Sequence, residues 1–240
     1  MPIDSDHRGS DSRYVARVWR GRTSGVERMT SIATSTWELV FWDDDGVPHA
    51  GVLGPETAAS TAVITGDSAS FGITFEHGTW MPHLPIGPLV DGGTESPHVT
   101  GRRFVLRGAE WEIPDFDTAE QFVDRLVREG VLMRDPLVGD VVRGENSDGP
   151  GDRSVQRRVA AATGLTRGAI RQIERARAAA VLLRDGAAPL ETVHRTGFYD
   201  QAHLARALRR FIGRTATQLR SGDDGDPLSL LYKPEADGRS

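Results

Sequence analysis

The sequence predicts an α+β protein, in which a β-rich N-terminal barrel or sandwich precedes an all-α C-terminal domain. Between residues 14 and 114, short runs of β-branched and aromatic residues alternate with Gly, Pro, Asp and Ser, a pattern typical of short strands and turns. From residue 115 onward, apolar residues recur with the spacing of amphipathic helices. A chain of 240 residues suits one large domain or two modest ones.

The clearest strand is expected at residues 37–42, whose sequence WELVFW is followed by a DDDG turn. Further strands are expected at residues 15–19, 50–53, 62–64, 70–75 and 103–106. All five Trp lie in this part of the chain, and a β-domain rich in aromatic side chains suits a small-molecule pocket. Each Trp could equally fill a small β core. The candidate ligand-binding residues are Trp37, Trp42, Phe75, His77 and Trp80.

The segments on either side of the β-rich part have different patterns. Residues 1–13 are polar and predict a disordered lead. Residues 115–133 predict a helix, which Asp117 and Glu120 would open with a capping box. A short helix is expected at residues 135–144, and the Gly, Pro, Asn and Asp residues at 146–152 predict a linker.

Charge is distributed unevenly along the chain. The formal net charge is −5, which taken alone argues against a nucleic-acid partner. Residues 151–220, however, contain 14 Arg and only five Asp or Glu, so the acidic excess lies in the rest of the chain. This asymmetry indicates an anion-binding domain joined to an acidic one. Arg also suits bidentate contacts to phosphate and guanine.

A basic amphipathic helix is expected within residues 196–220. Leu204, Leu208 and Phe211 fall on one side of a helical wheel, and the opposite side is rich in Arg. A basic face on an isolated helix is usually only solvated. Here a short helix and a Thr-Gly turn precede it, within residues 189–197. A helix, a glycine turn and a basic helix follow one another in helix-turn-helix units.

This stretch resembles the C-terminal signature of the AraC/XylS family of transcription regulators, whose pattern runs roughly G-F/Y-x-D-x-x-x-(F/L)-x-R-x-(F/L)-(K/R)-(K/R)-x-x-G-x-T-P. The matching positions are Gly197, Phe198, Asp200, Leu204, Arg206, Leu208, Arg209, Arg210, Gly213 and Thr215. Two positions depart from the pattern, because Ala216 replaces the final Pro and Val193 replaces a small Ala. The first change predicts a looser end to the domain, and the second predicts crowding between the two helices.

A degenerate copy of this helix-turn-helix pattern lies earlier in the chain. The family pattern there is roughly S-x-R-x-L-x-R-x-F, then four residues of any type, then Gly. The corresponding positions are Gly151, Arg153, Val155, Arg157, Val159 and Gly164. Gly151 replaces the capping Ser and Val159 replaces the aromatic residue. Residues 167–184 resemble the Ala-rich helix that joins the two units in this family, and Gly186 ends it.

Residues 71–78 and 82–91 resemble the cupin-like N-terminal domain of one AraC-type branch, although His77 replaces the usual Pro. Cupin enzymes bind metal through clustered His and Glu. The candidates here are Glu76, His77, His83 and His98. They lack the H-x-H pair with a following Glu that would form a compact site, so we expect neither a metal nor another cofactor.

The resemblance implies a sequence-specific, ligand-responsive transcription regulator, whose two recognition helices enter successive major-groove segments about 34 Å apart. The implied DNA-binding residues are Arg153, Ser154, Gln156, Arg157, Arg158, Gln201, Ala202, His203, Arg206, Arg209 and Arg210. Arg206 can instead support the fold in this family. The implied partners are double-stranded DNA, a small-molecule effector, a second copy of the chain as a homodimer, and RNA polymerase.

The expected organisation follows from these patterns. It comprises a disordered lead (1–13), a β-rich sensor or dimerisation domain (14–114), connecting helices (115–145), an AraC-type DNA-binding domain (146–222) and a tail (223–240). The N-terminus lacks an apolar signal core, and no run of about 18 apolar residues occurs. We therefore expect no membrane association and a cytoplasmic protein that is nucleoid-associated when bound to DNA.

Two alternatives stay open at this point. The chain could be a cupin-like small-molecule-binding protein or metal enzyme, with a degenerate helical domain kept for assembly. It could also be a regulator without a ligand, whose β domain only dimerises. The chain has no Cys and no recognisable Ser/His/Asp arrangement, so no catalytic constellation is visible and we expect no enzymatic activity.

Overall fold

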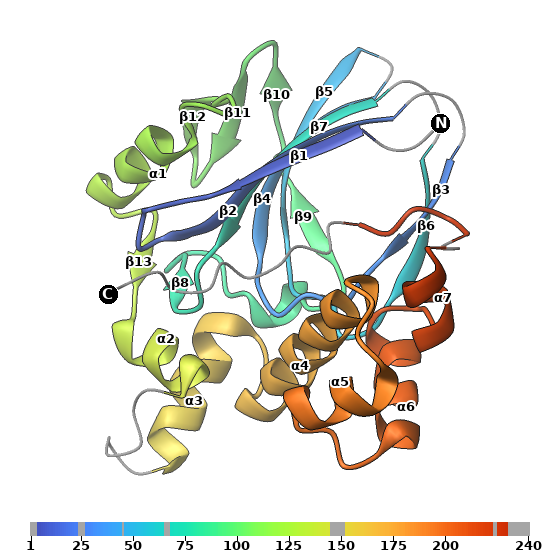
Figure 1. Ribbon diagram of the computed structural model, residues 1–240. Helices are drawn as coiled ribbons and strands as arrows, with labels where there is room; N and C mark the ends of the chain where they lie inside the picture. The colour runs from blue at the N-terminus through green and yellow to red at the C-terminus, as the bar shows by residue number, and fades with distance from the viewer. Residues whose placement is uncertain are drawn as a thin grey trace. The chain divides into compact units, whose positions relative to one another are not determined.

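The computed structural model describes residues 4–23, 27–44, 46–64, 68–144, 152–222 and 225–229. The chain forms two compact units that interleave along the sequence. The first unit consists of residues 1–25, 36–55 and 65–167, and the second consists of residues 26–35, 56–64 and 168–240. The α+β class is confirmed, because the strands of a large sheet come first in the chain and most helices follow them (Figure 1).

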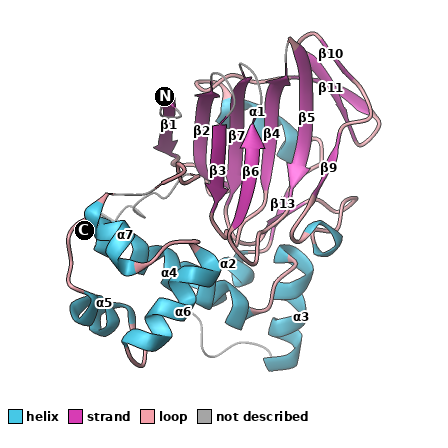
Figure 2. Ribbon diagram, turned by 90° about the vertical axis from the view of Figure 1, so that its right-hand side faces the viewer, coloured by secondary structure: helices cyan, strands magenta, loops and turns pink. Residues whose placement is uncertain are grey.

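Six antiparallel strands form the main sheet of the first unit (Figure 2). In spatial order they are β1 (Asp4–Gly9), β2 (Val15–Thr23), β7 (Ser68–Phe75), β4 (Glu38–Asp44), β5 (Val47–Leu53) and β9 (Gly93–Glu95). Among the described strands, β1 pairs only with β2 and β9 only with β5. The β-rich part that we expected is therefore an open sheet and not a closed barrel, because each edge strand is paired on one side only.

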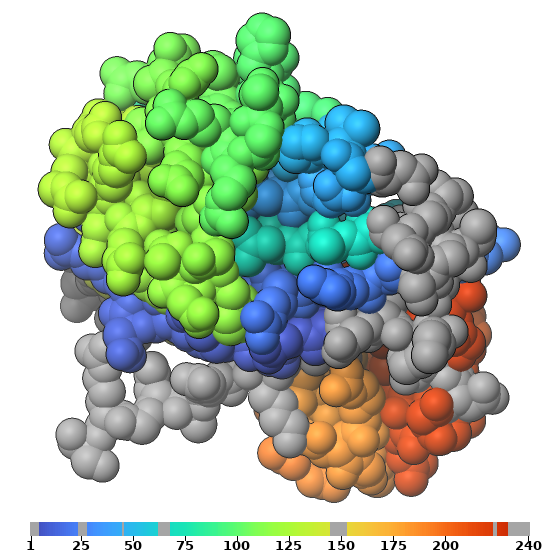
Figure 3. All heavy atoms as spheres, turned by 90° about the horizontal axis from the view of Figure 1, so that it is seen from above, coloured from blue at the N-terminus to red at the C-terminus, as the bar shows by residue number. Residues whose placement is uncertain are grey.

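Shorter strands and one helix contribute to the core on this sheet. They are β10 (Val99–Thr100), β11 (Arg103–Leu106), β12 (Ala109–Glu112) and α1 (Ala119–Arg128), which lie against the sheet in the space-filling view (Figure 3). Phe104 meets Phe41 edge-on with ring centroids 5.1 Å apart, and Trp111 meets Phe122 edge-on at 6.1 Å. Removing these large aromatic surfaces from water strongly stabilises the unit. Two smaller pieces are the pair of β8 (Thr79–Trp80) with β13 (Met133–Arg134) and the 3₁₀ helix η1 (Gly87–Leu89).

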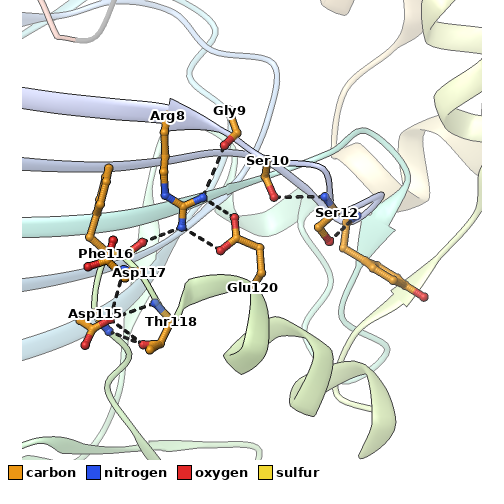
Figure 4. Close-up of polar contacts among 10 residues, drawn as sticks. Arg8, Gly9, Ser10, Ser12, Asp115, Phe116, Asp117, Thr118 and Glu120 are labelled. Atoms are coloured by element: carbon orange, nitrogen blue, oxygen red, sulfur yellow. Dashed lines mark hydrogen bonds and ion pairs between the residues drawn. The ribbon is translucent and has the colours of Figure 1, made fainter. Parts of the chain in front are cut away.

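The expectation of a disordered N-terminal lead is wrong for residues 4–9, which form β1. Arg8 of β1 donates hydrogen bonds to the Glu120 carboxylate on α1 at 2.5 and 2.8 Å, and to the Phe116 carbonyl at 2.6 Å (Figure 4). These bonds from Arg8 are the main reason why the pKa of Glu120 falls from 4.5 to about 2. The ladder with β2 and this ion pair hold the lead in place.

The capping box that we expected at the start of α1 is also wrong. Thr118, and not Asp117, occupies the N-cap, and its side chain makes no cap bond. The Glu120 carboxylate is bound by Arg8, while the Asp115 carboxylate accepts hydrogen bonds from the Thr118 amide and hydroxyl. The sequence pattern assigned the Glu120 carboxylate to the backbone of its own helix. In the structure this carboxylate is bound by Arg8, which lies far away in the sequence.

Two further helices belong to the first unit, close to where they were expected. α2 (Pro136–Arg143) follows Asp135, whose carboxylate accepts a hydrogen bond from the Leu137 amide, and ends at Gly144 with φ of 81°. α3 (Asp152–Thr163) packs against α2, β8 and η1. The expected linker at residues 146–152 lies outside the described residues, apart from the first residue of α3.

The second unit combines a strand pair from the N-terminal part with the C-terminal helices. β3 (Glu27–Ser31) and β6 (Ser60–Ile64) are antiparallel. The helices are α4 (Arg167–Arg184), which starts at the boundary between the units, α5 (Pro189–Thr196), α6 (Gln201–Phe211) and α7 (Ala216–Ser221). The first three confirm the expected helices. In the tail, Leu228 forms a parallel bridge with Thr30. None of the described helices is long and apolar enough to cross a membrane.

Candidate nucleic-acid interface

Helices α5 and α6 form a tight helix-turn-helix unit (Figure 2). Gly197 ends α5 in the left-handed conformation (φ 71°), and its amide donates to the Val193 carbonyl. Asp200 opens α6 as its N-cap, because its carboxylate accepts a 2.6 Å hydrogen bond from the His203 amide. Only residues 197–200 separate the two helices, which fixes the direction in which α6 leaves the turn.

The apolar side of α6 is the side that the sequence predicted. Leu204, Ala207, Leu208 and Phe211 are all buried. Val193 of α5, which replaces the small residue of the family pattern, is also buried. The helix pair therefore accommodates the two extra methyl groups of Val193 and remains closely packed. Thr215 and Gln218 form a capping box at the start of α7, so this helix starts without the Pro that Ala216 replaces.

The opposite side of α6 presents the predicted DNA-binding residues to solvent. Gln201, Ala202, Arg206, Arg209 and Arg210 are exposed, and His203 is half-buried. The Arg206 and Arg209 side chains form no hydrogen bond or ion pair with any described residue. The Arg210 guanidinium lies 5.0 Å from the Phe211 ring centroid. Two guanidinium groups are thus left free to bind an external anion, and no hydrogen bond or ion pair to a described residue gives Arg206 a supporting role.

A residue that the sequence did not single out, Arg175 of α4, holds the turn between α5 and α6. Its guanidinium donates to the Gly197 carbonyl at 3.1 Å and lies 4.5 Å from the Phe198 ring centroid. The Phe198 ring in turn meets the His203 ring edge-on at 5.1 Å. The only sequence signal for Arg175 was its place on the Ala-rich helix, where nothing distinguishes it from neighbouring Arg residues.

The other predicted contact residues lie on α3, the helix of the degenerate first copy. Arg153, Gln156 and Arg157 are exposed and Ser154 is half-buried. Val159 and Ala162 of the same helix are buried.

Arg158 differs from the other predicted contact residues, because the structure pairs it with an acidic side chain. Its guanidinium donates to both oxygens of Asp135 at 2.7 and 2.8 Å. This bidentate hydrogen bonding raises the pKa of Arg158. Asp135 is also the N-cap of α2, so Arg158 ties α3 to α2.

None of the five candidate ligand-binding residues lines the cavity of the first unit that is described below. Trp37 is 3 % exposed, stacks on Phe75 at 4.0 Å and donates its indole N–H to the Thr79 carbonyl at 2.8 Å. Trp42 stacks on His49, while His77 and Trp80 are half-buried. Trp37 and Phe75 therefore fill the core, as the alternative interpretation of the tryptophans allowed.

A cavity of about 190 Å³ lies instead between β4, β5 and β11 in the first unit. Its apolar lining includes Leu39, Ala50, Val52, Leu84, Phe104 and Leu106. His83 and Arg107 add polar groups. Burial, and then the charge of Arg107, lower the pKa of His83, which favours the neutral imidazole.

Metal-ligating side chains are not brought together in the described part of the chain. No group of three or more His, Asp or Glu residues there is arranged to hold a metal ion. The four candidates from the sequence, Glu76, His77, His83 and His98, therefore do not form such a group.

Comparison with known proteins gives one match. Residues 149–222 match the family model of a helix-turn-helix domain. The search of curated proteins and the search of solved structures each returned no match. The matched range includes α3 and α6, the two helices that carry the predicted contact residues. Residues 149–222 are therefore an AraC-type helix-turn-helix domain, the DNA-binding module of a transcription regulator.

Proposed function

We propose that the protein regulates transcription by sequence-specific binding to double-stranded DNA, with α6 as the principal reading helix. The observation that carries this proposal is the solvent-facing side of α6, where Arg206 and Arg209 have no partner among the described residues. Unpaired guanidinium groups can bind phosphates or guanine edges without first breaking an internal ion pair. Gln201 and His203, in the first turn of α6, are the proposed readers of base edges.

In this proposal α3 provides a second contact to the same DNA. Arg153, Gln156 and Arg157 are its exposed polar side chains. Ser154 and Ala202 lie among these contact residues and are small enough to let the helix backbone approach the groove. The two helices would enter successive major-groove segments, which places two recognition blocks about 10 base pairs apart.

We further propose that the N-terminal part of the chain, residues 14–114, senses a small molecule. The support for this is the cavity between β4, β5 and β11, which at about 190 Å³ suits a compact ligand. An engineered apolar cavity of about 150 Å³ is large enough for benzene. The apolar lining with Arg107 and His83 at its edge favours a small apolar molecule with one acidic or hydroxyl group. Homodimerisation and contact with RNA polymerase, on nucleoid DNA in the cytoplasm, complete the proposal.

The experiment that tests DNA recognition is selection of bound sequences from a random duplex pool at about 0.15 M salt, which already weakens non-specific attraction. Enrichment of two blocks about one helical turn apart is the expected result. A single enriched block would assign reading to α6 alone. Weak, salt-sensitive binding without enrichment, with and without candidate ligands, would contradict the proposal.

The sensing role is tested by thermal unfolding of the full chain with small aromatic acids and their neutral analogues. A ligand at 100 times its Kd stabilises the folded state by about 2.7 kcal/mol. Filling the cavity with Ala50→Leu should abolish the stabilisation while unfolding stays cooperative. Equal stabilisation of the wild type and this variant would place the ligand elsewhere.

A further inference from the structure

The second compact unit contains two short segments from the N-terminal part, residues 30–35 and 56–59, which we call the N-terminal clamp. The first segment leads from β3 to β4, and the second leads from β5 to β6. The two segments are bound to each other, since the Thr34 amide donates to the Glu56 carbonyl at 3.1 Å and the Glu56 amide donates to the Thr34 carbonyl at 2.9 Å. The Ser31 hydroxyl also donates to the Glu56 carboxylate at 2.6 Å.

The clamp is hydrogen-bonded to the C-terminal end of α6. The Ala59 amide donates to the Arg210 carbonyl and the Ala33 amide donates to the Phe211 carbonyl, both at 2.8 Å. The last carbonyls of a helix have no partner within the helix. Here two of them accept hydrogen bonds from amides that lie more than 100 residues away in the sequence. Gly213 lets the clamp approach, because a Cβ there would lie 3.0 Å from Thr30 Cγ2.

The clamp is also attached to α4. Arg177 is 7 % exposed and donates a 2.9 Å hydrogen bond to the Ala33 carbonyl. The Ser35 hydroxyl donates to the Glu174 carboxylate. Ala33 therefore binds the backbone of α6 through its amide and the Arg177 side chain of α4 through its carbonyl, so this one residue bridges the two helices.

We propose that the N-terminal clamp positions α6 and thereby regulates DNA binding by the second helix-turn-helix unit. This inference rests on the proposed DNA-binding function. The clamped carbonyls belong to Arg210 and Phe211, next to the free side chain of Arg209 in the last turn of α6. A shift of the clamp would move this turn, and recognition of bases tolerates little displacement of the reading helix.

Both segments of the clamp are covalently connected to strands that line the cavity proposed to bind the small molecule. Ser35 precedes the first residue of β4 by three positions, and Glu56 follows the last residue of β5 by three positions. Leu39 of β4 and Ala50 and Val52 of β5 line the cavity. A ligand that changes the position of these strands would therefore pull directly on both segments of the clamp. DNA binding and ligand binding would then influence each other reciprocally.

The test compares two glycine substitutions in the full-length chain. Gly213→Ala and Gly222→Ala both place a Cβ on a left-handed residue, with φ of +72° and +68°. Only the Cβ at Gly213 meets the clamp, whereas nothing lies within 4 Å of one at Gly222. The matched pair therefore separates pressure on the clamp from the backbone strain that both variants share.

Affinity is measured for the selected DNA site and for a random duplex, together with hydrogen exchange of the amides in α6. We expect Gly213→Ala to weaken binding to the selected site by about tenfold more than Gly222→Ala does, within the usual range of coupling between sites. Exchange should accelerate at residues 209–212, while affinity for the random duplex stays unchanged. Equal site affinities and equal exchange in the two variants would overturn the inference.

A second pair of variants loosens the clamp without touching α6. Arg177→Met removes the bond to the Ala33 carbonyl, and Arg171→Met removes an exposed charge from the same helix as its control. We expect only Arg177→Met to accelerate exchange at residues 209–212 and to weaken binding to the selected site. Unchanged exchange in a folded Arg177→Met variant would also contradict the clamp. If the wild type bound no selected site at all, the proposed function would fail, and the exchange data would still decide whether the clamp holds α6.

Discussion

The two helices that carry predicted DNA-binding residues, α3 and α6, each carry three Arg, and among the described residues only Arg158 of α3 is paired with a carboxylate. On α6, Arg206 and Arg209 have no partner among the described residues. On α3, two nitrogens of the Arg158 guanidinium donate to the two carboxylate oxygens of Asp135. An Arg that already has a carboxylate must give it up, or share it, before it can bind a phosphate. The same residue type in similar motifs is therefore unequally available for DNA.

The packing of the two helices differs in the same direction. α3 packs against α2, β8 and η1 and is part of the first compact unit. α6 packs against α5 in the second unit and keeps its whole basic side exposed. We therefore expect α6 to supply most of the recognition, whereas Arg158 of α3 also attaches that helix to the start of α2.

The largest effect is expected when both free cations of α6 are removed. Arg206→Ala with Arg209→Ala should lower affinity for the selected site by about 100-fold or more and reduce the salt slope by about 2. The matched variant on α3 is Arg153→Ala with Arg157→Ala, which removes the same charge. Titrations over a range of salt concentrations measure both slopes. An equal or larger loss from the α3 variant would break the proposed ranking of the helices.

A smaller effect is expected from Arg175, which supports the turn before α6. Arg175→Met loses the hydrogen bond to the Gly197 carbonyl and the contact with the Phe198 ring. Together these contribute about 1–2 kcal/mol. Affinity for the selected site should fall by about tenfold, and discrimination against altered sites should fall with it. Arg175→Lys, which keeps the charge but not the planar group, should restore little of the discrimination, and full restoration would show that charge alone matters.

Acid should destabilise the unit that contains α3, because that unit contains the ion pair of Glu120 with Arg8. The pKa of Glu120 lies at about 2 in the folded state, below its ordinary value of 4.5. The ion pair with Arg8 therefore stabilises the first unit fully above about pH 4.5, and this contribution is lost as the pH falls toward 2. After allowance for partial solvent exposure, it amounts to about 1–2 kcal/mol.

The variant Glu120→Gln isolates this contribution. It should unfold more easily than the wild type at pH 6, and its stability should change less between pH 5 and pH 2. Denaturant unfolding at each pH provides the measurement, and parallel pH profiles for the two proteins would contradict the assignment. DNA binding at neutral pH should change little, because neither Arg8 nor Glu120 lies in the helix-turn-helix domain.

The smallest effect on DNA binding is expected from Arg158. Because Asp135 binds this guanidinium, Arg158→Ala should change affinity for the selected site by less than about threefold and leave the salt slope unchanged. Asp135→Asn weakens the ion pair while keeping an N-cap for α2. It should release Arg158 and increase the salt slope. A fall of about 1 in the slope for Arg158→Ala would instead show that this residue binds phosphate despite its partner.

Much of the helical part was predictable from the sequence, because its signals are local. Asp200 and Gly197 mark the ends of α6 and α5 through hydrogen bonds that span only three or four residues. The spacing of Leu204, Leu208 and Phe211 was enough to identify the buried side of α6, since a single helix period decides which side chains share a face. The match of residues 149–222 to the helix-turn-helix family has the same local basis.

The sequence by itself therefore determined the fold class, the helix-turn-helix domain and the exposed residues of α6. Only the tertiary structure decided which Arg side chains are paired with carboxylates and which segments support α6. Arg8 meets Glu120, Arg158 meets Asp135, and Ala33 meets Phe211 across separations of 112, 23 and 178 residues. Such pairings depend on how the whole chain packs and on which polar groups it buries, and no local propensity encodes them.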